Sequence, residues 1–500
     1  MKSFATNTSE PVGIAFASGR RQTGAAIIAA LAAVALMAGG WLILAGFAAA
    51  AFAFVLIAIG SIAMIKGDTD KFLIGWVFLY PVGYYLLSYP RERPVIQFDR
   101  LLILCLLMGI LAAGKSRIRK IPVELKRSAI AWGLFLVVTA ISFLMARKVI
   151  TVGRLIVDNL LLPAILGWYM VRQFRLRGNE KWLHTAICVI SIYSAAIGLA
   201  EVLLQKDLLA FPQSADYFAN DPTDRTQFAL LRPNGPFLAN QSFAIVGLIS
   251  LFLLAFLWTQ IRDGAGPWRR VFHYTGLVAA LLEANLPVFR SIFLTLILVV
   301  IIDVFWTTGY RRTLRLAVLA VFPTTVILIG LMLPSVLEDR KSSENVSNRL
   351  SQDRQTWRIF IDHPVFGVGL MNFTPTAGSQ PRYQADLDNT PPLNFPHNNL
   401  GWIAAETGMV GFVPFALSQI LLVAAFWRLA KRGERGRAVW KYFVFIFLSY
   451  WITGMTETAA YFGELNMWFI FAVGLLYCHG SSEQPVGAKQ TLPVVERVAV

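Results

Sequence analysis

The chain has 500 residues, of which 56% are hydrophobic and only 15% are charged, and its mean hydropathy is +0.59. Soluble domains carry about 25% charged residues, so this composition excludes a disordered chain, a coiled coil and a typical soluble enzyme. It indicates a protein that lies mostly in lipid. The formal net charge of +16 is explained better by basic cytoplasmic loops of a membrane protein than by nucleic-acid binding.

Apolar runs of the length that crosses a bilayer, about 20 residues, follow one another along the chain. Residues 24–65 are uncharged and too long for one span at about 1.5 Å per residue, so they predict a helical hairpin. Further spans are predicted at 72–89, 99–114, 128–146, 150–171, 182–204, 237–260, 272–286, 288–307, 313–333, 398–427, 439–455 and 461–478. The chain is therefore expected to be an all-α polytopic membrane protein with about fourteen spans.

The distribution of basic residues predicts the topology. If the N-terminus is inside, short basic loops such as Lys115-Ser-Arg-Ile-Arg-Lys120 are inside and every long loop is outside, as the positive-inside rule requires. The predicted regions are an inner N-terminus (1–23), transmembrane helices (24–204), an outer loop (205–236), transmembrane helices (237–333), a large outer loop (334–397), transmembrane helices (398–479) and an inner tail (480–500). Loops as long as the two outer ones are uncommon unless they are functional.

The large outer loop contains an amphipathic pattern. Leu350, Trp357 and Ile361 recur at spacings of seven and four, with two arginines among them. This pattern predicts a helix that lies on the membrane surface. His363-Pro364 is expected to end it.

Ionisable residues inside spans need a partner or a task, because each costs about 2.5–3.5 kcal/mol at mid-membrane on insertion scales. Arg154 and Asp158 are four residues apart and predict an ion pair within one helix. Glu201 and Asp303 lie near span ends and are expected to reach water. Arg290 has no acidic residue within four positions, so it is either an anion ligand or an arginine that extends to the interface.

His397 stands where the large outer loop meets the next span, in Phe395-Pro-His397-Asn-Asn-Leu-Gly-Trp402. A histidine there contacts both water and lipid, and its ordinary pKa near 6.5 suits proton transfer at neutral pH. This position alone does not indicate catalysis, because a histidine at such a boundary more commonly has a structural role.

The residues around His397 form an ordered set of motifs. Arg349…Trp357…Asp362-His-Pro-Val-Phe-Gly367-Val-Gly369…Asn372-Phe373 precedes His397-Asn-Asn-Leu400 and Glu406-Thr-Gly408-Met-Val-Gly411, and the order resembles the O-antigen ligase and polysaccharide polymerase family. Arg232-Pro-Asn-Gly235-Pro-Phe237…Asn240 is similar to the arginine-bearing outer-loop motif of that family, and Arg290-Ser-Ile-Phe-Leu294 matches its Arg-x-x-x-Leu pattern. The resemblance covers about residues 190–475. Members usually have about a dozen spans, so we expect 12–14.

The resemblance implies a GT-C-like, inverting, metal-independent glycosyltransferase without a cofactor. The donor would be a glycan on undecaprenyl pyrophosphate at the bacterial inner membrane, and the active face would be periplasmic. The acceptor would be a sugar hydroxyl, on lipid A core for an O-antigen ligase or on another lipid-linked repeat for a polysaccharide or exopolysaccharide polymerase. Both alternatives stay open, because the two classes share these motifs.

The residue chemistry independently suits this reaction. A pyrophosphate leaving group develops charge that fixed cations stabilise, and Arg232 and Arg290, both at the outer face, can supply them. His397 can accept the proton of a neutral acceptor hydroxyl.

Several neighbouring residues have expected supporting roles. Arg349 and Arg358 are candidates for binding phosphate or acceptor groups, and Asn398 for orienting the imidazole or the sugar. Glu406 lies nine residues after His397 and would point away from it on a regular helix, so a packing role is expected. Two glycines, Gly408 and Gly411, are expected to permit close approach of helices.

Two other classes of function compete with this hypothesis. Asp386-Leu-Asp388 has a spacing that can chelate a divalent cation, which would indicate a metal-dependent transferase. A multi-span transporter or flippase of lipid-linked sugars would show broken helices, repeats and charges at the membrane midplane. Here the unusual polar residues gather at the outer face, which favours glycan transfer.

Overall fold

The computed structural model describes residues 69–83, 87–89, 96–113, 121–209, 232–306, 343–384, 396, 398–456 and 459–481. The predicted hairpin at 24–65, the span at 313–333, most of the first outer loop and both ends of the chain lie outside these residues. The first half contains α3 (Thr69–Leu79), β1 (Ser88–Tyr89), β2 (Ile96–Gln97), α5 (Phe98–Ala113), α6 (Val123–Ser142), η2 (Phe143–Met145), α7 (Val149–Leu155), η3 (Ile156–Leu161), α8 (Leu162–Arg172) and α9 (Glu180–Leu204). The strands β1 and β2 form one short antiparallel pair.

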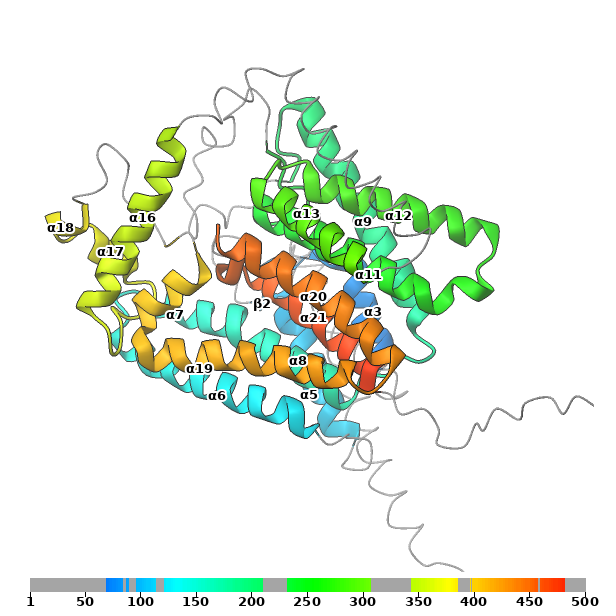
Figure 1. Cartoon of the computed structure of the whole chain (residues 1–500), viewed down its shortest axis with the longest axis horizontal. Coiled ribbons are helices and arrows are strands. Elements are labelled where there is room, and N and C mark those ends of the chain that lie inside the picture. Colours follow the sequence, from blue (N-terminus) through cyan, green and yellow to red (C-terminus); the bar gives the residue numbers. More distant parts are fainter. Residues whose placement is uncertain are drawn as a thin grey trace, which may run out of the picture.

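The second half of the described chain is also helical (Figure 1). It contains α11 (Asn240–Ile261), η5 (Arg262–Gly264), α12 (Pro267–Asn285), α13 (Arg290–Phe305), α16 (Ser343–Asp362), α17 (Phe373–Ala377), α18 (Pro381–Gln384), α19 (Asn399–Ala430), α20 (Glu434–Gly454), η6 (Ala459–Tyr461) and α21 (Gly463–Ser481). Five described helical segments are long and apolar enough to cross a membrane: Leu125–Met145, Val149–Arg172, Glu180–Leu204, Asn240–Gly264 and Asn399–Ala430. The prediction of an all-α polytopic membrane protein is confirmed.

The helices differ in how much of their surface the protein covers. The helix α11 is apolar on all sides, and 78% of its most apolar window is buried, as expected for a central helix. The corresponding fraction for Leu125–Met145, mainly α6, is 22%. Its Leu134, Val137 and Ile141 are more than half exposed, and α19 packs along its other side (Figure 1). We infer that α6 faces lipid.

The span that contains Arg154 and Asp158 is interrupted by a π-helical segment, η3. Pro163 has no N–H to donate to the carbonyl of Asn159, which explains the irregular turn. The side chain of Asn466 donates to that carbonyl instead, at 3.0 Å.

The predicted ion pair between Arg154 and Asp158 is wrong. Asp158 accepts two hydrogen bonds from Arg100 of α5, at 2.8 Å (Nε to Oδ1) and 2.7 Å (Nη2 to Oδ2). The prediction assumed that four residues make one regular turn, and the π-helical segment begins between the two residues. Asp303, which was expected to reach water, is bound by Lys441 of α20, and its side chain is only 16% exposed.

The amphipathic pattern in the large outer loop forms α16, which ends at Asp362 as predicted. One face, with Gln355, Thr356 and Ile359, is buried. The opposite face presents Leu350, Trp357 and Ile361, which are 53%, 59% and 56% exposed. The helix is therefore amphipathic in the sense that the sequence predicted, and its apolar stripe faces away from the protein. Its position on a membrane surface stays a prediction.

Candidate active site

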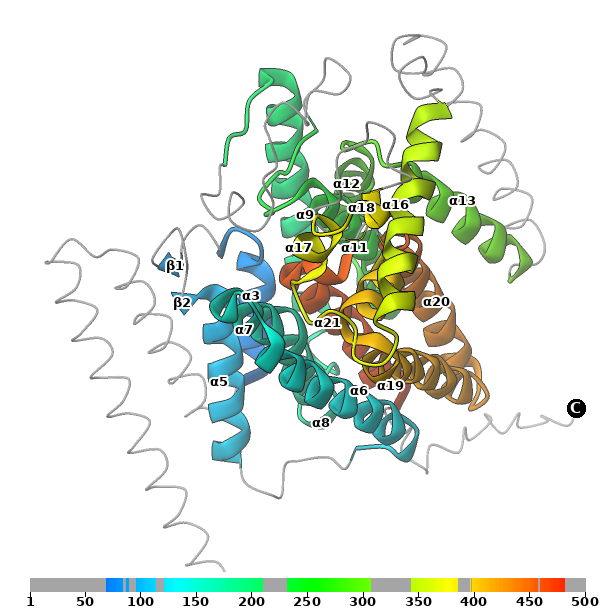
Figure 2. The ribbon, with the colours of Figure 1, turned by 90° about the vertical axis from the view of Figure 1, so that its left-hand side faces the viewer.

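Helix ends that are far apart in the sequence meet at one end of the molecule. The N–H of Leu238, before α11, donates to Glu464 of α21 at 3.2 Å. The N–H of Ala460, before α21, donates to Asn399 of α19 at 2.9 Å. Figure 2 looks onto this end, where α16, α17 and α18, which we call the cap, lie in front of α19 and α21. The described parts of both predicted outer loops therefore share one end of the bundle.

The segment that bears Arg232 is held by a buried carboxylate. Glu201, at the end of α9, accepts the N–H groups of Gly235 at 2.8 Å and Leu208 at 3.2 Å. Gly235 has a φ of +53°, and a Cβ there would lie 2.6 Å from Phe243, so this turn requires glycine. Glu201 was expected to reach water, and this was wrong. It is fully buried, because its oxygens take up backbone N–H groups of the loop.

Arg232 and Arg290 are brought into one neighbourhood. The Arg232 guanidinium carbon lies 5.5 Å from the ring centroid of Phe289, in cation–π contact. Phe289 is buried and directly precedes Arg290, the exposed first residue of α13. The turn before it places Val288 at a φ of +57°, which is a strained conformation for a β-branched residue. Arg232 thus contacts the residue that directly precedes Arg290, which brings the two predicted arginine motifs next to each other.

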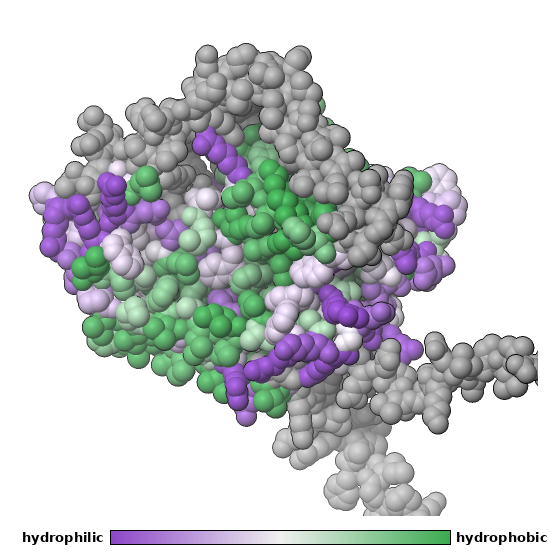
Figure 3. Space-filling view, viewed as in Figure 1, coloured by the Kyte–Doolittle hydropathy of each residue, from purple (hydrophilic) through white to green (hydrophobic). Residues whose placement is uncertain are grey.

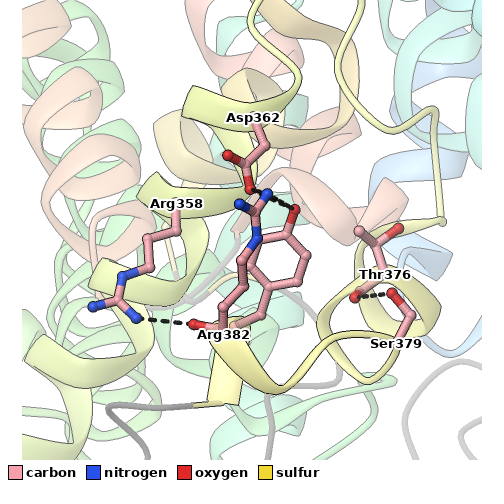
Figure 4. Close-up of polar contacts among 6 residues, drawn as sticks. Arg358, Asp362, Thr376, Ser379 and Arg382 are labelled. Atoms are coloured by element: carbon pink, nitrogen blue, oxygen red, sulfur yellow. Dashed lines mark hydrogen bonds and ion pairs between the residues drawn. The ribbon is translucent and has the colours of Figure 1, made fainter.

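The cap is fastened by a polar cluster that the sequence did not reveal (Figure 4). Tyr383, almost fully buried, donates to Asp362 Oδ2 at 2.6 Å, and Arg382 forms an ion pair with the same carboxylate. Arg358 Nη1 donates to the carbonyl of Arg382 at 2.9 Å. Burial and the bond to Asp362 raise the pKa of Tyr383 above its usual value of 10. The hydrogen bond with Tyr383, together with Asp362, raises the pKa of Arg382.

Asn398 joins the cap to the start of α19. Its side-chain oxygen accepts the N–H of Gly401 and so caps the helix. Its Nδ2 donates to Asp353 of α16 at 2.8 Å. In this structure, the amide that was expected to orient the imidazole or the sugar holds two helices together.

A second connection between cap and membrane domain is the glycine crossing, in which Pro364–Gly369 pairs with Ala405–Val410. Four backbone hydrogen bonds form it: Val368 N to Ala405 O (3.0 Å), Gly369 N to Glu406 O (2.9 Å), Met409 N to Pro364 O (2.8 Å) and Val410 N to Val365 O (3.1 Å). Gly408 has a φ of +60° inside α19. A Cβ there would lie 2.3 Å from the carbonyl oxygen of Val365, and one on Gly367 would lie 2.4 Å from the backbone of Glu406.

The expectation that Gly408 and Gly411 permit close approach of helices is only partly correct. Gly408 does permit close approach, but of the loop segment rather than of another helix. A Cβ on Gly411 would lie 2.2 Å from the hydroxyl oxygen of Thr407 in its own helix. Thr407 donates to the carbonyl of Ile403 at 2.6 Å, so Gly411 makes room for that side chain.

Glu406 is a buried hub at the same break in α19. Its carboxylate accepts the indole N–H of Trp402 at 2.6 Å, the hydroxyl of Tyr461 at 3.3 Å and the backbone N–H of Phe373 at 3.4 Å. These contacts fit the expected packing role, and they link α19 to η6 and to the segment after the glycine crossing.

An apolar cavity of about 350 Å³ lies between α6, α8, α19, α20 and α21. Trp402, Asn159 and Asn466 line it near the end of the bundle that carries the cap, and Leu125, Val171 and Tyr477 line it toward the opposite end. Asn466 accepts the hydroxyl of Tyr450 at 2.6 Å. The cavity therefore runs along the helices, starting beside the first turn of α19.

The remaining predicted site residues are not placed. His397 and Asp386-Leu-Asp388 lie outside the described residues, and of Arg349 only the backbone, within α16, is described. In the part of the chain that the structure describes, no three His, Cys, Asp or Glu side chains lie close enough together to hold a metal ion.

Sequence reasoning missed the Asp362–Arg382–Tyr383 cluster and the buried carboxylates Glu201 and Glu464. Their partners are distant in sequence or are backbone groups, so no local sequence pattern predicts these contacts. Of these features and the glycine crossing, only the crossing has a sequence signal: the glycine pair at 367 and 369, and Gly408 further along the chain.

Comparison with known proteins bears on this region. Residues 228–416 match the family model described as O-antigen ligase. The match contains Arg232, Arg290, the cap and His397, and it confirms the resemblance that the motifs indicated, over a shorter stretch than expected. No curated protein matches the chain.

Proposed function

Because residues 228–416 are O-antigen ligase-like, we propose that the chain is an inner-membrane glycosyltransferase with an outer catalytic face. It moves a glycan from undecaprenyl pyrophosphate to a sugar hydroxyl, with inversion at the anomeric carbon and without a metal. The end of the bundle that carries the cap faces the periplasm.

The observation that carries this proposal is the contact of Arg232 with the ring of Phe289, the residue directly before Arg290, which brings the two arginine motifs next to each other. Departure of a lipid pyrophosphate leaves negative charge on phosphate oxygens, and fixed guanidinium groups stabilise that charge in the transition state. Arginine suits this task because its planar donors match phosphate oxygens.

In the proposed step, His397 is the general base. The acceptor oxygen bonds to the anomeric carbon, the bond from that carbon to the phosphate oxygen breaks, and undecaprenyl pyrophosphate leaves with the electron pair. The acceptor proton passes to the imidazole of His397. The neighbouring Asn398 is fixed by its contacts with Gly401 and Asp353, which supports a rigid mounting for the base.

The other candidates have more limited support. Arg358 and Arg349 would bind anionic groups of donor or acceptor from α16, and Arg358 would do so while one nitrogen holds the carbonyl of Arg382. The apolar cavity beside Trp402 has the chemistry to receive an isoprenoid or acyl chain.

The first test is transfer and donor binding by the full-length protein with three single substitutions. We expect His397→Ala to lower transfer by about 10²–10⁴-fold, the usual contribution of a general base, while donor binding persists. Arg232→Ala and Arg290→Ala should weaken donor binding by about ten- to a hundredfold, because each removes a charge-assisted hydrogen-bond donor. Arg354→Ala is the matched control, since it removes an exposed arginine of α16.

Undiminished transfer by the inserted His397→Ala protein would remove this residue from the mechanism. Unchanged donor binding by both arginine variants would remove the phosphate role. Movement of lipid-linked glycan across the bilayer without transfer would favour a flippase. A deletion strain separates the two acceptor classes, since loss of a ligase leaves full-length unlinked polymer and loss of a polymerase leaves single lipid-linked repeats.

Metal removal tests the second part of the proposal. Transfer should continue at its original rate in EDTA, because the arginines supply the positive charge. Loss of activity that magnesium restores would instead favour the metal-dependent mechanism through Asp386-Leu-Asp388.

A further inference from the structure

A basic hollow lies at the end of the bundle opposite the candidate active site. It has a volume of about 760 Å³ and is formed where α13 and α19 end and α20 begins. The described residues around it include three tryptophans and three basic residues: Trp306, Trp427, Trp440, Lys431, Arg437 and Lys441.

The three basic residues have different surroundings. Lys441 is paired with Asp303. Arg437 lies 3.8 Å from Glu434, but both side chains are mostly exposed, and such pairs contribute little in water. The Lys431 ammonium lies 5.5 Å from the ring centroid of Trp427. The hollow therefore presents two accessible cations, Lys431 and Arg437, beside a neutralised one.

The tryptophans indicate that the hollow lies at a membrane–water boundary. Trp306 and Trp427 are 47% and 50% exposed, and indole rings concentrate where lipid headgroups meet acyl chains. On the same helix as Trp427, Leu417 and Ile420 are 45% and 64% exposed and form a lipid-facing surface. Figure 3 shows hydrophilic residues gathered at this end of the molecule, next to the hydrophobic surface of α6 and α19.

We propose that this hollow binds the headgroup of an anionic phospholipid from the inner leaflet, such as phosphatidylglycerol. Lys431 and Arg437 bind the phosphate, as basic pockets between transmembrane helices do. Trp427 and Trp306 flank the glycerol and the first methylene groups, and the acyl chains lie against α19. A neutral lipid lacks the net charge that these cations complement. The site is independent of glycan transfer, which takes place at the other end.

The test measures phosphatidylglycerol binding to the purified full-length protein in phosphatidylcholine nanodiscs, by native mass spectrometry of retained lipid. We expect Lys431→Gln/Arg437→Gln to bind about 25-fold more weakly, since each basic residue near a lipid surface contributes about a fivefold factor. The single variants should each lose about fivefold, so the test holds if the double variant does not fold.

The matched control is Arg175→Gln/Arg177→Gln. It also removes two exposed basic residues, but from outside the hollow. They follow α8, whose Met170 carbonyl accepts a hydrogen bond from Cys478 near the end of α21, so they lie at this end of the molecule. Unchanged binding by the Lys431 and Arg437 variants, or an equal loss in the control, would overturn the proposal, because the attraction would then be spread over the whole basic surface. Displacement of the lipid by an equal concentration of inorganic phosphate would also overturn it, in favour of a soluble-anion site.

Discussion

At the scale of single residues, the path of α19 depends on the absence of one Cβ atom. Gly408 combines a φ of +60° with a carbonyl oxygen 2.3 Å from where its Cβ would lie. Any other residue would have to leave the left-handed region or push the loop away. The hydrogen bonds of the glycine crossing depend on both the positive φ of Gly408 and the close approach of the Val365 carbonyl.

We predict that Gly408→Ala destabilises the protein by about 2–4 kcal/mol, from backbone strain and displacement of Val365. It should lower the thermal midpoint and reduce glycan transfer together. Gly75→Ala in α3 is the control, because nothing lies within 4 Å of its Cβ and alanine favours a helix. Equal midpoints for the two variants would contradict the role assigned to Gly408.

Residue-level reasoning from sequence succeeded where the partner is close in the chain and failed where it is distant. Spacing and residue type predicted the α16 helix, its end at Asp362 and the close approach of another segment at Gly408. The pairing of Asp158 with Arg100, 58 residues away, did not, because spacing rules assume a regular helix. The burial of Glu201 was also missed, since its partners are backbone groups of a later loop.

At the scale of elements, the cap is held by contacts between its own helices and by two connections to α19. Asp362 accepts a hydrogen bond from Tyr383 and forms an ion pair with Arg382, so α18 is fixed to the end of α16. Asn398 and the glycine crossing fix α16 to α19. The apolar stripe of α16 takes no part in these bonds and stays exposed.

The Tyr383 contact predicts a pH dependence. Its pKa is raised in the folded protein, so its contribution to stability is complete below pH of about 10, the ordinary tyrosine value. That contribution is lost as the pH rises through the folded-state pKa. At pH 8, Tyr383→Phe should cost about 1–2 kcal/mol for the lost hydrogen bond, and the difference from wild type should shrink above pH of about 10.

The measurement is the thermal midpoint of both proteins between pH 8 and 11. Tyr274→Phe, which removes an exposed tyrosine hydroxyl from α12, is the control and should follow wild type throughout. A Tyr383→Phe profile parallel to wild type at all pH values would contradict the proposed coupling.

At the scale of the whole molecule, hydropathy predicted the helices because burial in lipid is a property of composition averaged over about 20 residues. Which helices become neighbours depends on side-chain fit, and the sequence did not indicate that α11 is central or that α19 lies along α6. The charge pattern did predict that the two outer loops share a side. Their described parts lie at one end of the bundle, where Arg232 and Asn398 precede helices and Arg290 begins α13, while His397 lies outside the described residues.

The glycine crossing has a mechanical consequence. Ordinary helix breaks leave carbonyl and amide groups open to hydration. Here the two segments of the crossing hydrogen-bond to each other through such groups, so main-chain bonds restrain the joint. A force exerted on the cap by a bound sugar chain would therefore be transmitted to the first turns of α19 through main-chain atoms. Under the proposed function, glycan binding by the cap and alignment of the segment next to residue 397 would then be one movement instead of two.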